Sequence, residues 1–147
     1  MQASPLPNLL DIAPHGEFTR FRDTDIFVGS SSDFDFHIQI KVKARQLADI
    51  EAAKTYLSQI DAQWINAAID YAVTHKHIPL QDYIPEPDLW LTPEQFKRAL
   101  SQDPTLFIGS CVAPIGLTMT DGNMFGGHQI SVWANAEGKI RYASIDA

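Results

Sequence analysis

Residues 33–43 read Asp-Phe-Asp-Phe-His-Ile-Gln-Ile-Lys-Val-Lys, the clearest strand pattern in the chain. Apolar and polar side chains alternate strictly along it, as in a strand with one buried and one exposed face. From Gln46 to Tyr71 the apolar residues recur every three or four positions, which predicts one face of a helix. A half-buried strand followed by a long amphipathic helix predicts a sheet with helices against it.

The predicted helix has one point at which it can bend or restart. Asp61 lies within the run, and its carboxylate suits a cap for a second segment, so one helix and two helices both remain open. The helix is expected to end between Thr74 and His77, because Pro79 disfavours helical backbone in the residue before it. Residues 78–91 contain three prolines and three carboxylates, and they are predicted to form an exposed acidic loop.

A second, shorter helix is expected to begin at Thr92-Pro93-Glu94-Gln95. Threonine is a good N-cap, proline suits the first helical position, and glutamine three residues after the cap can bond back to it. Asp103-Pro104 is expected to close this helix.

Runs of β-branched and aromatic residues predict further strands on both sides of the helices. They cover residues 18–22, 25–28, 105–112, 115–120, 128–133 and 139–145. We expect an α+β domain: an antiparallel sheet of short N-terminal strands and a C-terminal meander, with one long or bent helix and one shorter helix packed on one face. Residues 1–14 are expected to be an N-terminal arm, and residues 15–147 a single domain.

Charge and composition narrow the classes of function. The formal charge is -7, from 18 acidic and 11 basic residues, which disfavours nucleic-acid binding and favours soluble monomers or a basic partner. Residues 1–14 lack the pattern of a signal peptide, and no apolar run has the length of a membrane span. The single cysteine, Cys111, cannot form an internal disulfide, so a cytoplasmic location is expected.

Three segments carry a resemblance to a known family. They are Trp90–Phe96, Asp121–Val132 and Gly138–Ile145, and they combine a tryptophan before a capped helix with an Asp-Gly-Asn-Met-Phe-Gly-Gly-His pattern before a strand. The chain resembles a family of small bacterial domains of unknown function over its C-terminal third to half. That resemblance implies the α+β fold and a bacterial cytosolic origin, and related small acidic domains include immunity proteins encoded beside toxin genes. The chain departs from the pattern at Ile145-Asp146-Ala147, which lacks a closing glycine.

The glycine-rich segment before the predicted strand at 128–133 is interpreted mainly as a structural motif. Its residues suit a tight or bulged connection between antiparallel strands, and they are Asp121, Gly122, Gly126, Gly127 and His128. We interpret His128 as a structural histidine that forms hydrogen bonds within the sheet. The alternative is a small hydrolase or transferase in which His128 acts as general acid or base with Asp121.

Two other groups of chemistry-bearing residues have simpler explanations. Cys111 with His128 and Asp121 has the residue types of a thiol-dependent site, but Cys111 lies in an apolar run typical of a core cysteine. The histidines of residues 75–77 with Asp82 have the residue types of a zinc site, but they lack the spacing of structural zinc sites. We therefore expect neither a metal nor a cofactor.

The predicted function depends on acidic and aromatic surface. The expected partner-binding residues are Asp82, Tyr83, Glu86, Asp88, Trp90, Met124 and Phe125. Such a surface predicts a non-enzymatic protein-binding domain of an immunity or regulatory type. The resemblance to the bacterial family implies its more specific form, a bacterial immunity-type protein that neutralises a cognate toxin by occluding it. The expected partner is a basic toxin domain; its identity and the oligomeric state stay open.

Overall fold

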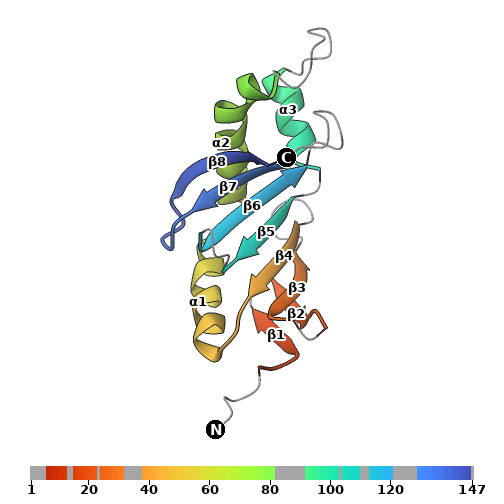
Figure 1. Cartoon of the computed structure of the whole chain (residues 1–147), viewed down its shortest axis with the longest axis vertical. Helices are drawn as coiled ribbons and strands as arrows, with labels where there is room; N and C mark the ends of the chain where they lie inside the picture. Colours follow the sequence, from red (N-terminus) through yellow and green to blue (C-terminus); the bar gives the residue numbers. More distant parts are fainter. Residues whose placement is uncertain are drawn as a thin grey trace.

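The structure, a computed structural model, describes residues 6–12, 15–22, 24–31, 38–81, 92–102, 104–109, 113–120 and 129–146. The described strands are β1 (Leu9–Ile12), β2 (Gly16–Arg20), β3 (Ile26–Ser31), β4 (Ile38–Lys43), β5 (Thr105–Ile108), β6 (Ile115–Thr120), β7 (Gln129–Ala134) and β8 (Ile140–Asp146). The described helices are α1 (Leu47–Ser58), α2 (Ala62–Gln81) and α3 (Pro93–Leu100). All eight strands join one sheet in chain order, so the predicted α+β class is confirmed (Figure 1).

The sheet is antiparallel at every junction except the one between β4 and β5. There Ile40 pairs with Leu106 and Val42 with Ile108 in parallel, so the expectation of a wholly antiparallel sheet is wrong at this pair. Parallel neighbours need a crossover connection, which the helical segment between β4 and β5 provides. The C-terminal meander from β5 to β8 is confirmed.

The long amphipathic stretch forms two helices, with the restart at Asp61. Asp61 Oδ1 accepts a hydrogen bond from the backbone N–H of Trp64 at 2.8 Å and caps the start of α2. The expected end between Thr74 and His77 is wrong, because α2 continues to Gln81 and includes Pro79. Pro79 lies in the last turn, where the helix loses only one hydrogen bond before it ends. Part of the segment predicted as a loop is therefore helical.

The predicted start of α3 is confirmed as a capping box. Thr92 Oγ1 accepts from the backbone N–H of Gln95 at 3.2 Å, and the Gln95 side chain accepts from the backbone N–H of Thr92 at 2.9 Å. Lys97 Nζ lies 2.7 Å from Asp70 Oδ1 and links α3 to α2. The pair is exposed, so it stabilises the contact only slightly.

Removing the Thr92 hydroxyl should therefore destabilise the protein. We expect Thr92→Ala to lower the free energy of unfolding by about 1 kcal/mol, measured by urea unfolding, because N–H groups of the first turn lose their acceptor. Thr55→Ala is the matched control: Thr55 lies inside α1, its hydroxyl bonds only to the backbone carbonyl of Glu51, and alanine is the better helix former. Equal losses for both variants would contradict a capping role for Thr92.

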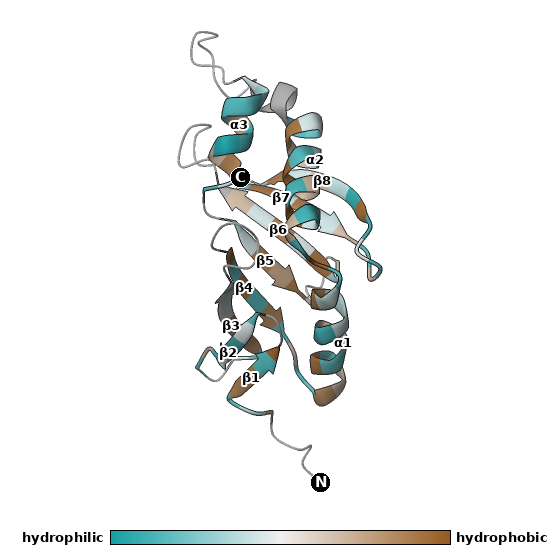
Figure 2. Cartoon of the chain, turned by 180° about the vertical axis from the view of Figure 1, so that it is seen from behind, coloured by the Kyte–Doolittle hydropathy of each residue, from teal (hydrophilic) through white to brown (hydrophobic). Residues whose placement is uncertain are grey.

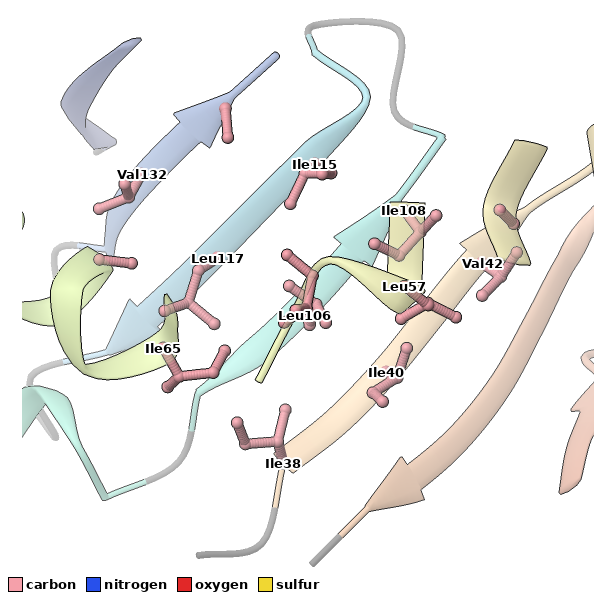
Figure 3. Packing of buried hydrophobic residues seen from close by; sticks show 14 of the residues in the cluster. Ile38, Ile40, Val42, Leu57, Ile65, Leu106, Ile108, Ile115, Leu117 and Val132 are labelled. Atoms are coloured by element: carbon pink, nitrogen blue, oxygen red, sulfur yellow. The ribbon is translucent and has the colours of Figure 1, made fainter. Parts of the chain in front are cut away.

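The core lies between one face of the sheet and the helices. A row of fully buried residues crosses the central strands on this face, as the register shows: Ile40, Leu106, Leu117 and Val132. Leu57 of α1 and Ile65 of α2 lie over this row (Figure 3). Phe96 and Leu100 bring α3 into the same core. The colouring of Figure 2 alternates between apolar and polar along β4, as expected for a strand with its apolar residues on the core side.

Strand β1 lies within the segment expected as an N-terminal arm. It buries Leu10 and Ile12 and pairs antiparallel with β2, where Leu9 lies opposite Thr19. The sequence Leu-Leu-Asp-Ile does not alternate strictly between apolar and polar residues, because the exposed Leu9 is apolar, so the pattern did not indicate a strand. The chain thus contributes to the sheet before residue 15.

Two side chains of α2 and that of Gln59, the residue after α1, hold the β7–β8 hairpin by three hydrogen bonds. Gln59 Nε2 and Trp64 Nε1 donate to the carbonyls of Ala136 and Gly138, each at 2.7 Å, and Tyr71 Oη donates to the carbonyl of Arg141 at 3.2 Å. The hairpin is thereby fixed against the helices on the core side. Its opposite side carries the aromatic residues Trp133 and Tyr142.

Candidate functional site

The residues predicted to form the site lie outside the described residues. This holds for Asp82, Tyr83, Glu86, Asp88 and Trp90, for Cys111, and for the segment from Asp121 to His128 with Met124 and Phe125. His75 is described: it is exposed on α2, and its ring centroid lies 4.1 Å from that of Tyr71. Among the residues that the structure describes, no group of three or more His, Cys, Asp or Glu side chains is placed to hold a metal ion.

A second row of residues crosses the sheet on the face opposite the core. Each member pairs with the next across neighbouring strands: Leu9, Thr19, Val28, Lys41, Phe107, Gly116, Trp133 and Tyr142. Paired residues share a face, and these positions alternate with the buried ones, so the row points away from the described helices. We call the surface formed by this row and its neighbours the open face.

Trp133 and Tyr142 form a pair of aromatic rings at one end of the row. The Trp133 indole lies over Gly116, where a Cβ would come within 2.5 Å of its Cζ3 atom, so a side chain at residue 116 would displace the ring. Its Nε1 donates to Ser144 Oγ at 3.3 Å, and its centroid lies 6.4 Å from that of Tyr142. Trp133 is half-buried, whereas Tyr142 is 44% exposed. Both rings thus contribute apolar surface outside the core.

Phe21 and Leu9 supply apolar surface at the other end. The backbone N–H of Phe21 donates to the carbonyl of Ile26 at 2.8 Å, and Ile26 pairs with Lys43. Phe21, Ile26 and Lys43 therefore form a second, shorter row beside the one from Leu9 to Tyr142. Phe21 is two residues from Thr19 and shares its face. Phe21 is 52% exposed and Leu9 49%.

The open face collects most of the exposed apolar side chains of the described residues. Four large apolar side chains are exposed, and three of them belong to this face: Leu9, Phe21 and Tyr142. The fourth, Leu47, is the first residue of α1. Single exposed apolar residues are normal in soluble proteins, but three of them on one face of a sheet make that face the candidate for an interaction surface.

Cations lie beside the aromatic rings of the open face. Lys41 Nζ is 5.5 Å from the centroid of Phe107, and Arg22 Cζ is 5.3 Å from the centroid of Phe21. Arg22 also has a positive φ of 51°, which is uncommon for a residue other than glycine. Both distances are within the range of favourable cation–π contacts.

Asp25, a carboxylate that Lys43 attracts, is already paired with Arg45. Asp25 Oδ2 lies 2.9 Å from Arg45 Nε. The hydrogen bond from Arg45 holds the pKa of Asp25 below its usual value, and Lys43 adds a smaller attraction of the same sign. Asp25 thus forms its ion pair with Arg45, at the edge of the open face.

A row of polar side chains lies beside the row from Leu9 to Tyr142 on the open face. It consists of Ser30, Gln39, Thr105, Thr118, Ser131 and Ser144, again paired from strand to strand. The hydroxyl oxygens of Thr118 and Ser131 are 3.1 Å apart, and Ser131 is only 2% exposed. The accessible part of this border is therefore at Ser30 and Gln39, which are exposed.

No protein-family model, curated protein or solved structure matches the chain. The resemblance carried by Trp90–Phe96 and Asp121–Val132 therefore stays a prediction. None of the helices in the described ranges is long and apolar enough to cross a membrane.

The sequence contained a signal for the open face that local motifs did not reveal. In β5, the sequence Thr-Leu-Phe-Ile places apolar residues at both odd and even positions, and β7 does the same with Ile-Ser-Val-Trp. Such strands have apolar residues on both faces, which indicates either burial on both sides or an exposed apolar surface. Apolar residues on both faces of β5 and β7 identify Phe107 and Trp133 as open-face residues from the sequence. Phe21 and Tyr142 can be placed on that face only from the strand pairing in the structure.

Proposed function

We propose that the chain is a non-enzymatic protein-binding domain that docks its partner on the open face. The observation that carries the proposal is the concentration of exposed Leu9, Phe21 and Tyr142 on the side of the sheet opposite the helices. Tyrosine, tryptophan and phenylalanine are enriched in the centres of protein interfaces, where they contribute most of the binding energy. Protein binding also needs no catalytic group.

The dimensions of the sheet suit such a role. Eight strands at a spacing of about 4.8 Å give a sheet about 34 Å wide. A standard interface buries about 800 Å² on each partner, which corresponds to a round patch about 32 Å across. The open face is therefore wide enough to cover the active site of another protein.

The biological form of this activity that we propose is immunity: the domain occludes a cognate toxin. The formal charge of -7 supports attraction of a toxin that is basic overall, because long-range charge accelerates the encounter of oppositely charged proteins. The acidic and aromatic contacts proposed at Asp82, Glu86, Asp88 and Trp90 would add to the open face, and they stay predictions.

Growth rescue tests the proposal. Expression of a toxin-like gene located beside the gene of this protein should arrest growth, and co-expression of this chain should restore it. The double variant Phe21→Ser with Tyr142→Ser is expected to lose rescue and to weaken the purified complex on the order of 100-fold, measured by calorimetry, because two exposed interface rings are removed.

Leu47→Ser is the matched control, since it removes an equally exposed apolar side chain from α1 instead of the open face. It should leave rescue and affinity unchanged. His128→Gln should also preserve rescue, whereas a hydrolase or transferase would lose turnover at an unchanged melting temperature. Failure of rescue with every neighbouring gene product would count against immunity, and equal losses for the Leu47 and the double variants would count against the open face.

A further inference from the structure

Cations border the apolar surface of β3 to β5 on the open face, although the whole chain is acidic. The chain carries a formal charge of -7, yet Lys41 and Lys43 of β4 lie on this face and Arg22 lies over Phe21. Asp25, the carboxylate that Lys43 attracts, is paired with Arg45. Within the described part of the chain, no ion pair involves any of these three cations. Asp11 and Glu17 face each other on the same side, but at the opposite end of β1 and β2 from the turn that holds Arg22.

Two of these cations lie over aromatic rings that a bound partner would cover. Lys41 lies over Phe107 and Arg22 over Phe21, so both charges are next to apolar surface that a partner would cover. Covering that surface removes water from around the cations, which is costly unless an anionic group of the partner replaces the water. A carboxylate next to an apolar side chain meets both requirements.

We infer that the open face binds an acidic protein segment, whose carboxylates contact Lys41, Lys43 and Arg22 and whose apolar side chains cover Phe21 and Phe107. This inference rests on the proposed function and names the chemistry of the partner at that site. Charge complementarity favours an acidic segment, because a basic segment would be repelled by three cations, none of which forms an ion pair within the described residues. A toxin that is basic overall satisfies the inference when the part that it lays on the open face is acidic.

Nucleic acid is a less suitable occupant, although aromatic rings and lysines on a sheet can also bind single strands. Phosphate backbones are attracted by an extended positive surface, and seven excess negative charges oppose that attraction. An acidic protein segment carries fewer charges per unit length and brings apolar side chains to the rings. We therefore propose a protein, and treat nucleic acid and anionic membrane as outcomes of the test.

Nuclear magnetic resonance titration of the full chain tests the inference. The probes are a synthetic amphipathic peptide with alternating glutamate and leucine or tryptophan, the same peptide with lysine in place of glutamate, oligouridylate, and phosphatidylglycerol vesicles. We expect the glutamate peptide alone to shift amide signals of β2 to β5 and β7. Lys41→Glu with Lys43→Glu should weaken this binding on the order of tenfold or more.

Lys54→Glu with Lys139→Glu is the control, since it makes the same change of charge on α1 and on the β7–β8 turn. It should change affinity by less than about twofold, and amide spectra should show that both double variants are folded. Stronger binding of the lysine peptide, of oligouridylate or of vesicles at the open face would overturn the inference. So would the absence of shifts at millimolar glutamate peptide, or an unchanged affinity in the Lys41 and Lys43 double variant.

The same variants separate this inference from the proposed function. If the Phe21 and Tyr142 variant loses toxin neutralisation while the Lys41 and Lys43 variant retains it, the open face binds the toxin but the acidic segment is wrong. If both variants retain neutralisation, the docking surface itself is wrong. Loss of neutralisation in both supports the two proposals together.

Discussion

Gly29→Ala is expected to lower the free energy of unfolding by about 3 kcal/mol, near the upper end of the cost of overpacking a core. A Cβ at residue 29 would lie 1.7 Å from Cδ1 of Phe18 and 2.3 Å from its Cε1, so the ring must move. Phe18 is fully buried against the core and has no open space into which to rotate. Urea unfolding with an unchanged slope would measure the loss.

Gly116→Ala is the matched control on the other face of the sheet. Its Cβ would meet the Trp133 ring at 2.5 Å, a clash of similar kind, but Trp133 is half-buried and can swing outward. We expect a cost of about 1 kcal/mol, accompanied by a change in tryptophan fluorescence and weaker partner binding. Phe18→Leu should restore part of the stability of Gly29→Ala and nothing in Gly116→Ala. Equal costs at the two glycines would contradict the assignment of a buried and an open face.

Phe27→Ala is expected to cost about 4 kcal/mol, whereas Phe107→Ala should cost about 1 kcal/mol. Phe27 is fully buried and pairs with Val42 on the core face, so its removal leaves a cavity that the surrounding side chains cannot fill. Phe107 is only partly buried on the open face, where water replaces the lost ring. Thermal and urea unfolding of both variants would measure the difference.

Phe107→Ala should nevertheless weaken partner binding, because it removes the ring beneath Lys41. The pair of variants therefore separates stability from binding on two sides of one sheet. A loss of stability at Phe107 as large as that at Phe27 would mean that the open face is covered within the folded chain.

The sequence predicted well those features that depend on local chemistry. Alternation along residues 33–43 placed Ile38, Ile40 and Val42 on one face, and all three are buried. Thr92 and Gln95 predicted the capping box that starts α3. The predicted strands after α3 agree with β5 to β8 in number and order. Both ends of β7 and of β8 are shifted by one residue, and β5 ends at Ile108, four residues before the predicted end.

Features that depend on distant contacts could not be predicted in the same way. Side-chain alternation does not specify the direction of a neighbouring strand, so the parallel pairing of Ile40 with Leu106 was missed. The sequence predicts a site in the loops, because turn residues and carboxylates form recognisable patterns there. Lys41 and Phe107 are far apart in the sequence, and only the register of β4 with β5 brings them together.

The single parallel junction between β4 and β5 also has a consequence for folding kinetics. Within β1 to β4 and within β5 to β8, consecutive strands are joined by short connections, so each half of the sheet can form from contacts of low sequence separation. Joining the two halves requires closure of the whole helical segment, and such non-local closure is slow because its entropy cost precedes the contacts that offset it. We therefore expect the pairing of β4 with β5, which closes the segment containing α1, α2 and α3, to limit the folding rate. Contacts across that junction, such as the cation–π contact of Lys41 with Phe107, should form last.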